Sequence, residues 1–190
     1  MKVLITGVSQ GLGWFLAMEL LKQGHEVWGI SRKGPEHQTI SDLHQYPNFT
    51  YSSCDLTQEN QVVKFIDEIT QRNFYAEALI LNAALMENDY INDQWDFLKF
   101  KEIIEVNLIG AANLTAKLLP SFQQRKKGII VGISSIASIR ALLTNKIAYA
   151  ASKAALNMTF ESLRLQMGYS YPDIRFITVI LGPLEQKDQP

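Results

Sequence analysis

The 190-residue sequence lacks the features that mark secreted, disulfide-bonded or membrane-spanning chains. Its single cysteine, Cys54, cannot form an internal disulfide and suits a reducing compartment. No apolar run approaches the ~20 residues of a membrane span, and the apolar stretch at the start is too short for a secretory signal. We therefore expect a cytoplasmic protein with no membrane partner.

An excess of charge of one sign is also missing. The 18 Lys and Arg residues nearly balance the 19 Asp and Glu residues, which leaves a formal net charge of -1. Because this balance gives no broad positive field, nucleic acid is not an expected partner. The three histidines, His25, His37 and His44, have no ligand-like spacing, so we expect surface positions for them and no metal site.

The composition is typical of a compact globular chain. Hydrophobic residues make up 47% of it, and a chain of this length can bury a core that needs no metal or disulfide. We find no internal repeat, low-complexity tract or linker. The sequence therefore predicts one domain over residues 1–190.

Short apolar runs alternate with longer amphipathic segments along the whole sequence. The runs are nearly continuous in apolar residues, as is typical of parallel strands that are covered on both faces. The predicted strands are Val3–Ile5, Glu26–Ile30, Phe49–Ser53, Ala78–Leu81, Ile129–Ile133 and Phe176–Leu181.

Four segments between these runs have apolar residues at intervals of three and four, which predicts helices that each bury one stripe. The alternation of strands and helices predicts an α/β fold with an open, doubly wound parallel sheet of about six strands and helices on both faces. We expect long loops at Lys33–Asn48 and Glu87–Phe97. The predicted helices are Leu12–Gln23, Glu59–Gln71, Phe100–Gln124 and Ala148–Met167.

A glycine-rich turn joins the first predicted strand to the first predicted helix. Glycines at such a corner let the backbone approach a pyrophosphate, whose charge lies on the free N–H groups of the helix N-terminus. The plainer alternative is a tight corner that binds no ligand. The strand–turn–helix context favours a nucleotide site. The turn consists of Thr6, Gly7, Val8, Ser9, Gln10, Gly11, Leu12 and Gly13.

At these positions the sequence resembles the short-chain dehydrogenases/reductases of the classical type, whose Thr-Gly-x-x-x-Gly-x-Gly turn it matches at every fixed position. The resemblance covers essentially the whole chain and implies a Rossmann-like fold. Further matches follow in the family's own order and approximate spacing. They are Asp55 with Leu56, the strand end Leu81 to Ala84, Asn107, Ser135 and the run from Tyr149 to Lys153.

The resemblance implies an oxidoreductase that transfers a hydride between a nicotinamide cofactor and a small carbonyl or alcohol. It implies that Asp55 contacts the adenine ring and that Asn82, Ala83 and Ala84 lie under the adenosine ribose. Leu56 and the residues after the last strand complete the implied cofactor contacts. Those last residues are Gly182, Pro183 and Leu184.

The end of the second predicted strand bears on the choice of cofactor. An acidic residue there bonds a ribose 2′-hydroxyl, whereas an arginine accommodates a 2′-phosphate. This chain has Ser31, Arg32 and Lys33, so we favour NADP(H) over NAD(H). The alternative is that the two cations belong only to a solvated loop.

Tyr149 and Lys153 are four residues apart and so share one face of the last predicted helix. An ammonium beside a tyrosine favours the phenolate and so lowers the pKa of the phenol. The tyrosine can then exchange a proton with a substrate oxygen more readily. The resemblance implies that Ser135 bonds that oxygen and that Lys153 also holds the nicotinamide ribose. It implies that Asn107 bends the helix that contains it and anchors a water in a proton relay to Lys153.

The sequence departs from the family pattern near its end. The chain stops about one helix and one strand short of the usual family end, and Gln186 stands where a threonine is expected. An NADP-binding sensor or regulatory module without efficient turnover therefore remains an alternative. The resemblance also implies that the two long helices, Phe100–Gln124 and Ala148–Met167, pair with their copies, so we expect a homodimer through them.

Overall fold

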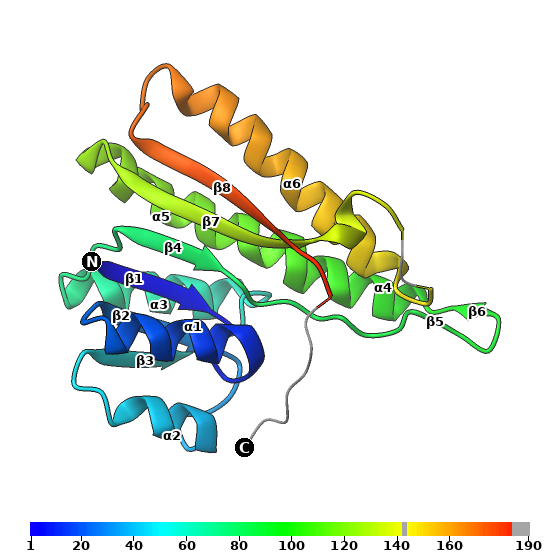
Figure 1. Ribbon diagram of the computed structural model, residues 1–190, viewed down its shortest axis with the longest axis horizontal. Coiled ribbons are helices and arrows are strands. Elements are labelled where there is room, and N and C mark those ends of the chain that lie inside the picture. Colours follow the sequence, from blue (N-terminus) through cyan, green and yellow to red (C-terminus); the bar gives the residue numbers. More distant parts are fainter. Residues whose placement is uncertain (142–143, 184–190) are drawn as a thin grey trace.

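The computed structural model describes residues 1–141 and 144–183, and its centre is a six-stranded parallel sheet in the order β3-β2-β1-β4-β7-β8 (Figure 1). This confirms the predicted α/β class. The strands are β1 (Lys2–Thr6), β2 (Glu26–Ser31), β3 (Phe49–Ser53), β4 (Ala78–Leu81), β7 (Gly128–Ser135) and β8 (Ile174–Leu181). Helices lie on both faces of the sheet.

One face of the sheet is covered along its whole width. The helices on it are α3 (Glu59–Gln71), α5 (Ala111–Arg125) and α6 (Ile147–Gly168). Each places a stripe of buried apolar residues over the strands, as the intervals in the sequence predict. The packing residues include Phe65 of α3, Phe122 of α5 and Phe160 of α6.

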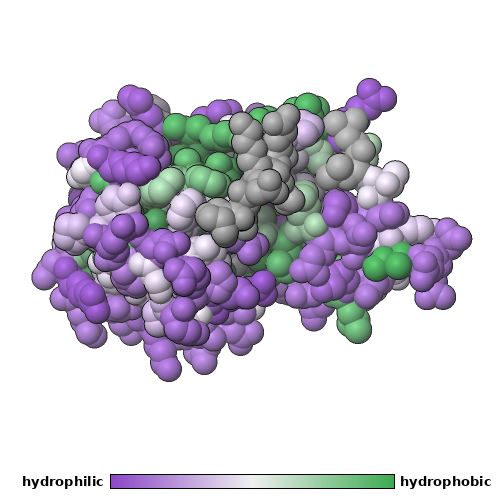
Figure 2. All heavy atoms as spheres, turned by 60° about the horizontal axis from the view of Figure 1, so that its bottom comes forward, coloured by the Kyte–Doolittle hydropathy of each residue, from purple (hydrophilic) through white to green (hydrophobic). Residues whose placement is uncertain are grey.

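The opposite face is covered only in part. The helices α1 (Gly11–Lys22) and α2 (Gln38–His44) pack over β1, β2 and β3. Beyond them, the apolar residues of β7 and β8 on this face are only partly buried, and Ile177 is 41% exposed. Figure 2 shows exposed apolar side chains in this area. Within the described residues, helices therefore lie on both faces of the sheet, as predicted, but on this face they leave β7 and β8 partly uncovered.

The structure corrects the first predicted loop. The region Lys33–Asn48 contains α2, whose Ile40 and Leu43 are fully buried against β1 and β2. Two apolar anchors in a seven-residue helix are too few to give a periodic signal in the sequence. Of the histidines, His44 is exposed, whereas His25 and His37 are partly buried.

The second predicted loop, Glu87–Phe97, was also wrong. It contains a small antiparallel hairpin, β5 (Tyr90–Ile91) and β6 (Gln94–Trp95). Both residues of its turn, Asn92 and Asp93, have positive φ, as a tight hairpin turn requires. Strands of two residues are too short to show an alternating pattern.

The predicted helix Phe100–Gln124 is three consecutive segments. The helix α4 (Phe97–Ile104) begins three residues earlier than predicted, a π-helical segment η1 (Glu105–Gly110) follows, and α5 continues to Arg125. A short 3-10 segment, η2 (Ile136–Ser138), follows β7. Among the described residues, no helix combines the length and apolarity that crossing a bilayer requires.

Candidate active site

The glycine turn lies at the carboxyl end of β1, as predicted. Gly7 and Gly11 have φ values of +76° and +56°, where side chains with a Cβ are strained. At Gly13 a Cβ would overlap the Gly7 carbonyl and the Asn82 amide. The turn therefore needs glycine at all three positions.

Asn82, at the end of β4, holds this turn from beside it. Its side-chain amide donates to the carbonyl oxygens of Thr6 (3.1 Å) and Gly7 (3.2 Å). The buried Thr6 hydroxyl in turn accepts the backbone N–H groups of Asn82 (3.0 Å) and Ala83 (2.9 Å). Asn82 thus fixes the shape of the turn, and its predicted place under a ribose stays a prediction.

The N-terminus of α1 fits an anionic ligand. Gln10 occupies the N-cap position with an extended backbone, no side chain caps the helix, and no acidic residue lies in its first turn. The first N–H groups of such a helix have no intrahelical acceptor, and the helix dipole favours negative charge there. This donor set suits the pyrophosphate of a dinucleotide.

The end of β2 presents two cations. Arg32 and Lys33 are exposed, and neither forms an ion pair with any residue in the described ranges. Ser31 is buried, and its Oγ lies 2.8 Å from the hydroxyl of Tyr51 and accepts the N–H of Lys33 at 3.3 Å. The turn is therefore held from β3 while its charges face solvent.

Asp55, which was expected to contact the adenine, and Leu56, which was expected among the cofactor contacts, have structural roles of their own. Asp55 Oδ1 accepts the backbone N–H (2.9 Å) and the hydroxyl (2.8 Å) of Thr57 and so shapes the turn before α3. Leu56 is a core residue that packs against Gly110, where a Cβ would lie 2.8 Å from the Leu56 Cβ.

Tyr149 and Lys153 lie in the first two turns of α6. Lys153 is 2% exposed, and its Nζ donates to the carbonyl oxygen of Ile133 at 2.7 Å. The same nitrogen is 5.8 Å from the centre of the Tyr149 ring. Burial lowers the pKa of Lys153 from 10.5 to about 8. The structure thus combines a partly buried phenol with a buried amine.

The two serines at the end of β7 differ in their surroundings. The Ser134 hydroxyl is buried beneath α6 and lies 3.4 Å from the carbonyl oxygen of Lys153, to which it donates. Ser135 is only partly buried, and its hydroxyl accepts the N–H of Ala137 at 3.2 Å. Ser135 is therefore the less enclosed of the two serines, and its contact with a substrate oxygen stays a prediction.

Asn107 lies in η1 and is 1% exposed. Its amide nitrogen donates to the carbonyl oxygen of Leu85 (2.9 Å) and to Ser152 Oγ (3.1 Å), and its oxygen accepts the N–H of Leu85 (2.7 Å). The Ser152 hydroxyl donates to the carbonyl oxygen of Tyr149 at 2.8 Å. Asn107 is therefore linked to α6 through Ser152.

The remaining predicted positions lie at the edges of this region. Ala84 is exposed after β4, and Gly182 and Pro183 are exposed after β8. Leu184 and Gln186 lie outside the described residues. Within those residues, no group of three or more His, Cys, Asp or Glu side chains is placed to hold a metal ion.

Sequence reasoning missed one polar residue beside this region, Asp89. Its side chain is fully buried, and its two carboxylate oxygens accept the N–H groups of Ile147 (2.7 Å) and Ala148 (2.8 Å) at the start of α6. The contact spans 58 and 59 positions of sequence. Asp89 lies in a region expected to be a loop, so no local pattern indicated its role.

Comparison with known proteins agrees with this geometry. Residues 1–188 match the family model for short chain dehydrogenases. An uncharacterized oxidoreductase of Myxococcus xanthus is 32% identical over 86% of this chain. The NADPH-dependent pterin aldehyde reductase of Arabidopsis thaliana is 31% identical over 70% of it. The solved structure of ElxO with NADP bound is 27% identical over 95% of the chain, with a TM-score of 0.85.

The chain spans only part of these proteins. The matched regions cover 65% of the Myxococcus protein, 55% of the Arabidopsis reductase and 73% of the ElxO chain.

Proposed function

Because this chain belongs to the short-chain dehydrogenase family, we propose that it transfers a hydride between NADP(H) and a small carbonyl or alcohol substrate. The observation that carries this proposal is the pairing of Tyr149 with the buried Lys153 beside the end of β7. The site lies at the carboxyl edge of the sheet, where open α/β folds bind their ligands. The glycine turn opens on the same edge.

In the reductive direction the chain's own residues handle the substrate oxygen. The Ser135 hydroxyl donates a hydrogen bond to that oxygen and orients the carbonyl. The Tyr149 hydroxyl delivers its proton to the oxygen as the carbonyl carbon is reduced. The nicotinamide supplies the hydride when it is bound. Lys153 holds the ribose and, with Asn107 and a bound water, returns a proton to Tyr149.

The proposed cofactor contacts follow the residues described above. The N–H groups of Gly11, Leu12 and Gly13 at the start of α1 bind the pyrophosphate, and Ser9 and Gln10 line the approach to it. Arg32, with Ser31 beside it, binds the 2′-phosphate of NADP(H). The NADPH-dependent Arabidopsis relative and the NADP-bound ElxO structure support this choice.

Turnover tests the activity directly. Purified protein with NADPH and a panel of aldehydes and ketones should oxidise the nucleotide in a carbonyl-dependent manner. Tyr149→Phe keeps the ring and removes the acid, so turnover should be lost while NADPH affinity stays within about threefold. NADPH binding without turnover on any carbonyl would instead support the sensor function.

The cofactor preference has its own test. Arg32→Ala should weaken NADPH binding about ten- to a hundredfold, which is the worth of one charge-assisted hydrogen bond, and should leave NADH binding nearly unchanged. Arg72→Ala is a matched control because Arg72 is exposed at the opposite end of the sheet. Equal losses for both nucleotides would show that Arg32 supports the turn and not the 2′-phosphate.

We also propose a homodimer through α5 and α6. Most apolar residues of these helices face the sheet, but Met158 and Leu165 of α6 are 62% and 74% exposed. A shallow surface hollow on α6 is lined by Ala155, Met158, Thr159, Ser162, Leu163 and Gln166. Sedimentation at micromolar concentration should give a dimer that Met158→Glu dissociates. A monomeric parent protein would contradict this proposal.

A further inference from the structure

The start of α6 is held by a carboxylate from elsewhere in the chain. Lys146 is the N-cap residue of this helix, and no side chain of its own segment caps the helix. Asp89 does so from the segment that follows β4, through the hydrogen bonds of 2.7 and 2.8 Å to Ile147 and Ala148. Each of its two oxygens therefore satisfies one of the N–H groups that a helix start leaves without a partner.

Neighbouring contacts reinforce this attachment. The N–H of Asp89 donates to the carbonyl oxygen of Asn145 at 2.9 Å. Lys146 Nζ donates in the other direction, to the carbonyl oxygen of Met86 (2.9 Å) and to Asn88 Oδ1 (3.1 Å). The segments 86–89 and 145–148 are thus joined at several points, and among their polar side chains only the Asp89 carboxylate is fully buried.

The same segment is also attached at its start. Leu85 exchanges two hydrogen bonds with Asn107, which contacts Ser152 on α6. Residues 85–89 therefore touch α6 directly through Asp89 and indirectly through Asn107. Tyr149 is the residue after Ala148, so it lies immediately after the backbone that Asp89 holds, between the two points of contact.

We propose that Asp89 is a positioning residue that fixes the first turn of α6 and, through it, the place of the Tyr149 hydroxyl. This inference rests on the proposed hydride-transfer function for its effect on rate. A buried carboxylate is suited to the task because charge-assisted hydrogen bonds are short and strong and because negative charge complements a helix N-terminus. Displacing a reacting group by about 1 Å can cost on the order of a hundredfold in rate.

The hairpin supplies a matched control. Asp96 caps α4 in a similar way, since its Oδ1 accepts the N–H of Lys99 at 2.9 Å. It lies at the far end of the hairpin that begins after Asp89, and its own N–H donates to the Asp89 carbonyl oxygen. Asp89→Asn and Asp96→Asn therefore make the same change at two helix starts, only one of which carries Tyr149.

Steady-state kinetics with NADPH and a carbonyl that is turned over by the parent protein test the proposal. Asp89→Asn should lower kcat about 10- to 100-fold and change the KM for NADPH less than about threefold. The deuterium isotope effect on kcat with 4-deuterated NADPH should rise, because a displaced acid makes the chemical step limiting. Asp96→Asn should leave kcat within about twofold and the isotope effect unchanged.

A structural role alone gives a different result. Partial unfolding lowers the concentration of active protein without raising the isotope effect, and it affects both variants according to their stability. An unchanged kcat and isotope effect in Asp89→Asn, or equal losses in both variants, would overturn the proposal. If Asp89→Asn does not fold, Lys146→Ala removes two contacts of the same attachment from the exposed side and should lower kcat about two- to fivefold with the same rise in isotope effect.

Amide hydrogen exchange separates this inference from the proposed function. In Asp89→Asn the amides of Ile147 and Ala148 should exchange faster, whereas in Asp96→Asn the amide of Lys99 should respond. If the parent protein turns over no carbonyl, the proposed function fails, and faster exchange at the start of α6 still supports Asp89 as the group that holds this turn. Unchanged exchange would overturn that assignment whatever the activity.

Discussion

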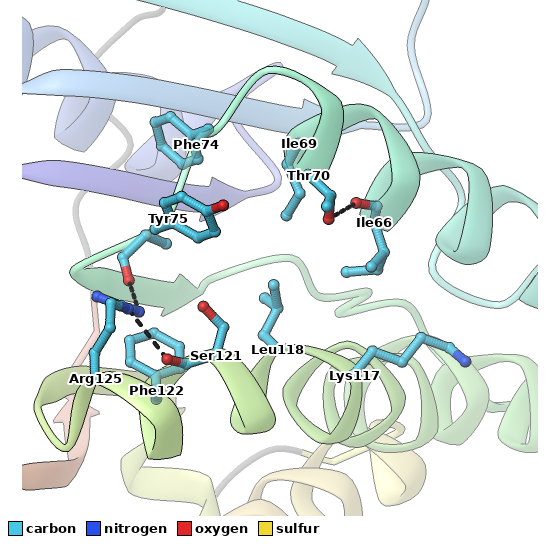
Figure 3. Close-up of a pocket in the computed structure, with 11 residues that line it drawn as sticks. Ile66, Ile69, Thr70, Phe74, Tyr75, Lys117, Leu118, Ser121, Phe122 and Arg125 are labelled. Carbon is cyan, nitrogen blue, oxygen red and sulfur yellow. Dashed lines mark hydrogen bonds between the residues drawn. The ribbon is translucent and has the colours of Figure 1, made fainter.

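The two ends of the parallel sheet bury different kinds of side chain. At the carboxyl ends of the strands, the structure buries polar or charged groups, among them Thr6, Asp89, Asn107 and Lys153. At the amino ends, aromatic rings dominate, and Trp28 packs edge-on against Phe65 and Phe74 with ring centres 6.1 and 5.1 Å away. A small cavity of about 80 Å³ lies beside Phe74, between α3 and α5 (Figure 3).

This difference indicates that the two ends serve different purposes. Burying a polar group costs free energy unless it is paired, and burying a charge costs more. The carboxyl end carries that cost in several hydrogen-bonded polar groups around the proposed site, whereas the amino end gains stability from apolar burial. Substitutions at the amino end should therefore change stability alone, and substitutions at the carboxyl end should change nucleotide binding or turnover.

The largest effect on stability is expected from Phe122→Ala at the amino end. Phe122 is 1% exposed, lines the cavity between α3 and α5, and lies under the guanidinium of Arg125 (Figure 3). Removing a buried ring costs about 3–5 kcal/mol, and here it also enlarges an existing cavity. Urea unfolding should show this loss, and NADPH affinity of the folded protein should be unchanged. A large loss of affinity would break the comparison.

The next effect has the opposite sign and lies at the carboxyl end. Lys153→Met removes a charge whose pKa burial lowers from 10.5 to about 8, a shift that corresponds to about 3 kcal/mol. The substitution also removes the hydrogen bond to the carbonyl oxygen of Ile133, and this loss lowers the stability of the variant by about 1 kcal/mol. We expect the ligand-free variant to be about 2 kcal/mol more stable than the parent at pH 7 and to lack turnover.

The stability gain of Lys153→Met should depend on pH in a defined way. Below pH 8, Lys153 is protonated in both folded and unfolded parent protein, and the cost of its buried charge is present in full. Between pH 8 and 10.5 the folded state has released the proton and the unfolded state still binds it, so the parent gains stability as pH rises. The difference between the two proteins should shrink across this window in urea unfolding.

Arg125→Met is the matched control at the amino end. Arg125 donates to the carbonyl oxygens of Ala76 (2.7 Å) and Ser121 (3.1 Å), and it is only partly buried. Its removal should destabilise the protein. A stabilised Arg125→Met, or a destabilised Lys153→Met, would contradict the view that the cost of buried charge is concentrated at the carboxyl end.

A smaller effect is expected from Asn82→Ala and Asn48→Ala, which should lose similar stability but differ in NADPH affinity. Each amide donates to two backbone carbonyls, Asn82 to Thr6 and Gly7 at the carboxyl end and Asn48 to Leu21 and His25 at the amino end. Both variants should lose about 1–2 kcal/mol of stability. Only Asn82→Ala should weaken NADPH binding, because only it loosens the glycine turn. Calorimetric titration of both variants measures the contrast.

Features with a local signature could be predicted from the sequence. The six parallel strands, the glycine turn and the shared helix face of Tyr149 and Lys153 depend on apolar runs, fixed spacings and a family resemblance. The helix α2 could not be predicted, because Ile40 and Leu43 are its only buried anchors. The π-helical form of η1 was not predicted either, because Asn107 implied only a bend, and its contacts with Leu85 and Ser152 are distant in the sequence.

Features that depend on distant contacts escaped prediction for the same reason. Nothing in the sequence around Asp89 distinguishes it from other loop carboxylates, because its partners at the start of α6 are distant in the sequence. The partly exposed face of β7 and β8 was missed because a continuous apolar run indicates burial but does not say which helix provides it. The chemistry of the candidate residues could be predicted from their residue types. The hydrogen bonds and packing that hold them in place come from distant parts of the chain and could not be predicted.

The smallest effect is expected from Tyr51→Phe in the middle of β3, whose hydroxyl reaches the carboxyl end of β2, measured against Tyr75→Phe at the amino end of the sheet. The Tyr51 hydroxyl lies 2.8 Å from Ser31 Oγ and also bonds the carbonyl of Lys33, so it holds the turn that presents Arg32. Losing one such bond is worth about 1 kcal/mol. NADPH affinity should therefore fall by about fivefold, and NADH affinity by less, because the proposed contact of Arg32 is with the 2′-phosphate alone.

Tyr75→Phe removes the same hydroxyl group from a residue that has no hydrogen bond to the turn that carries Arg32. Tyr75 is 47% exposed, and its hydroxyl donates only a long hydrogen bond of 3.5 Å to Asn73. Tyr75→Phe should leave the affinity for both nucleotides and the midpoint of urea unfolding unchanged. If the two variants lose NADPH affinity equally, the turn at Arg32 does not depend on Tyr51. If NADH affinity falls as far as NADPH affinity in Tyr51→Phe, that hydroxyl supports the fold of the whole edge and not the 2′-phosphate contact.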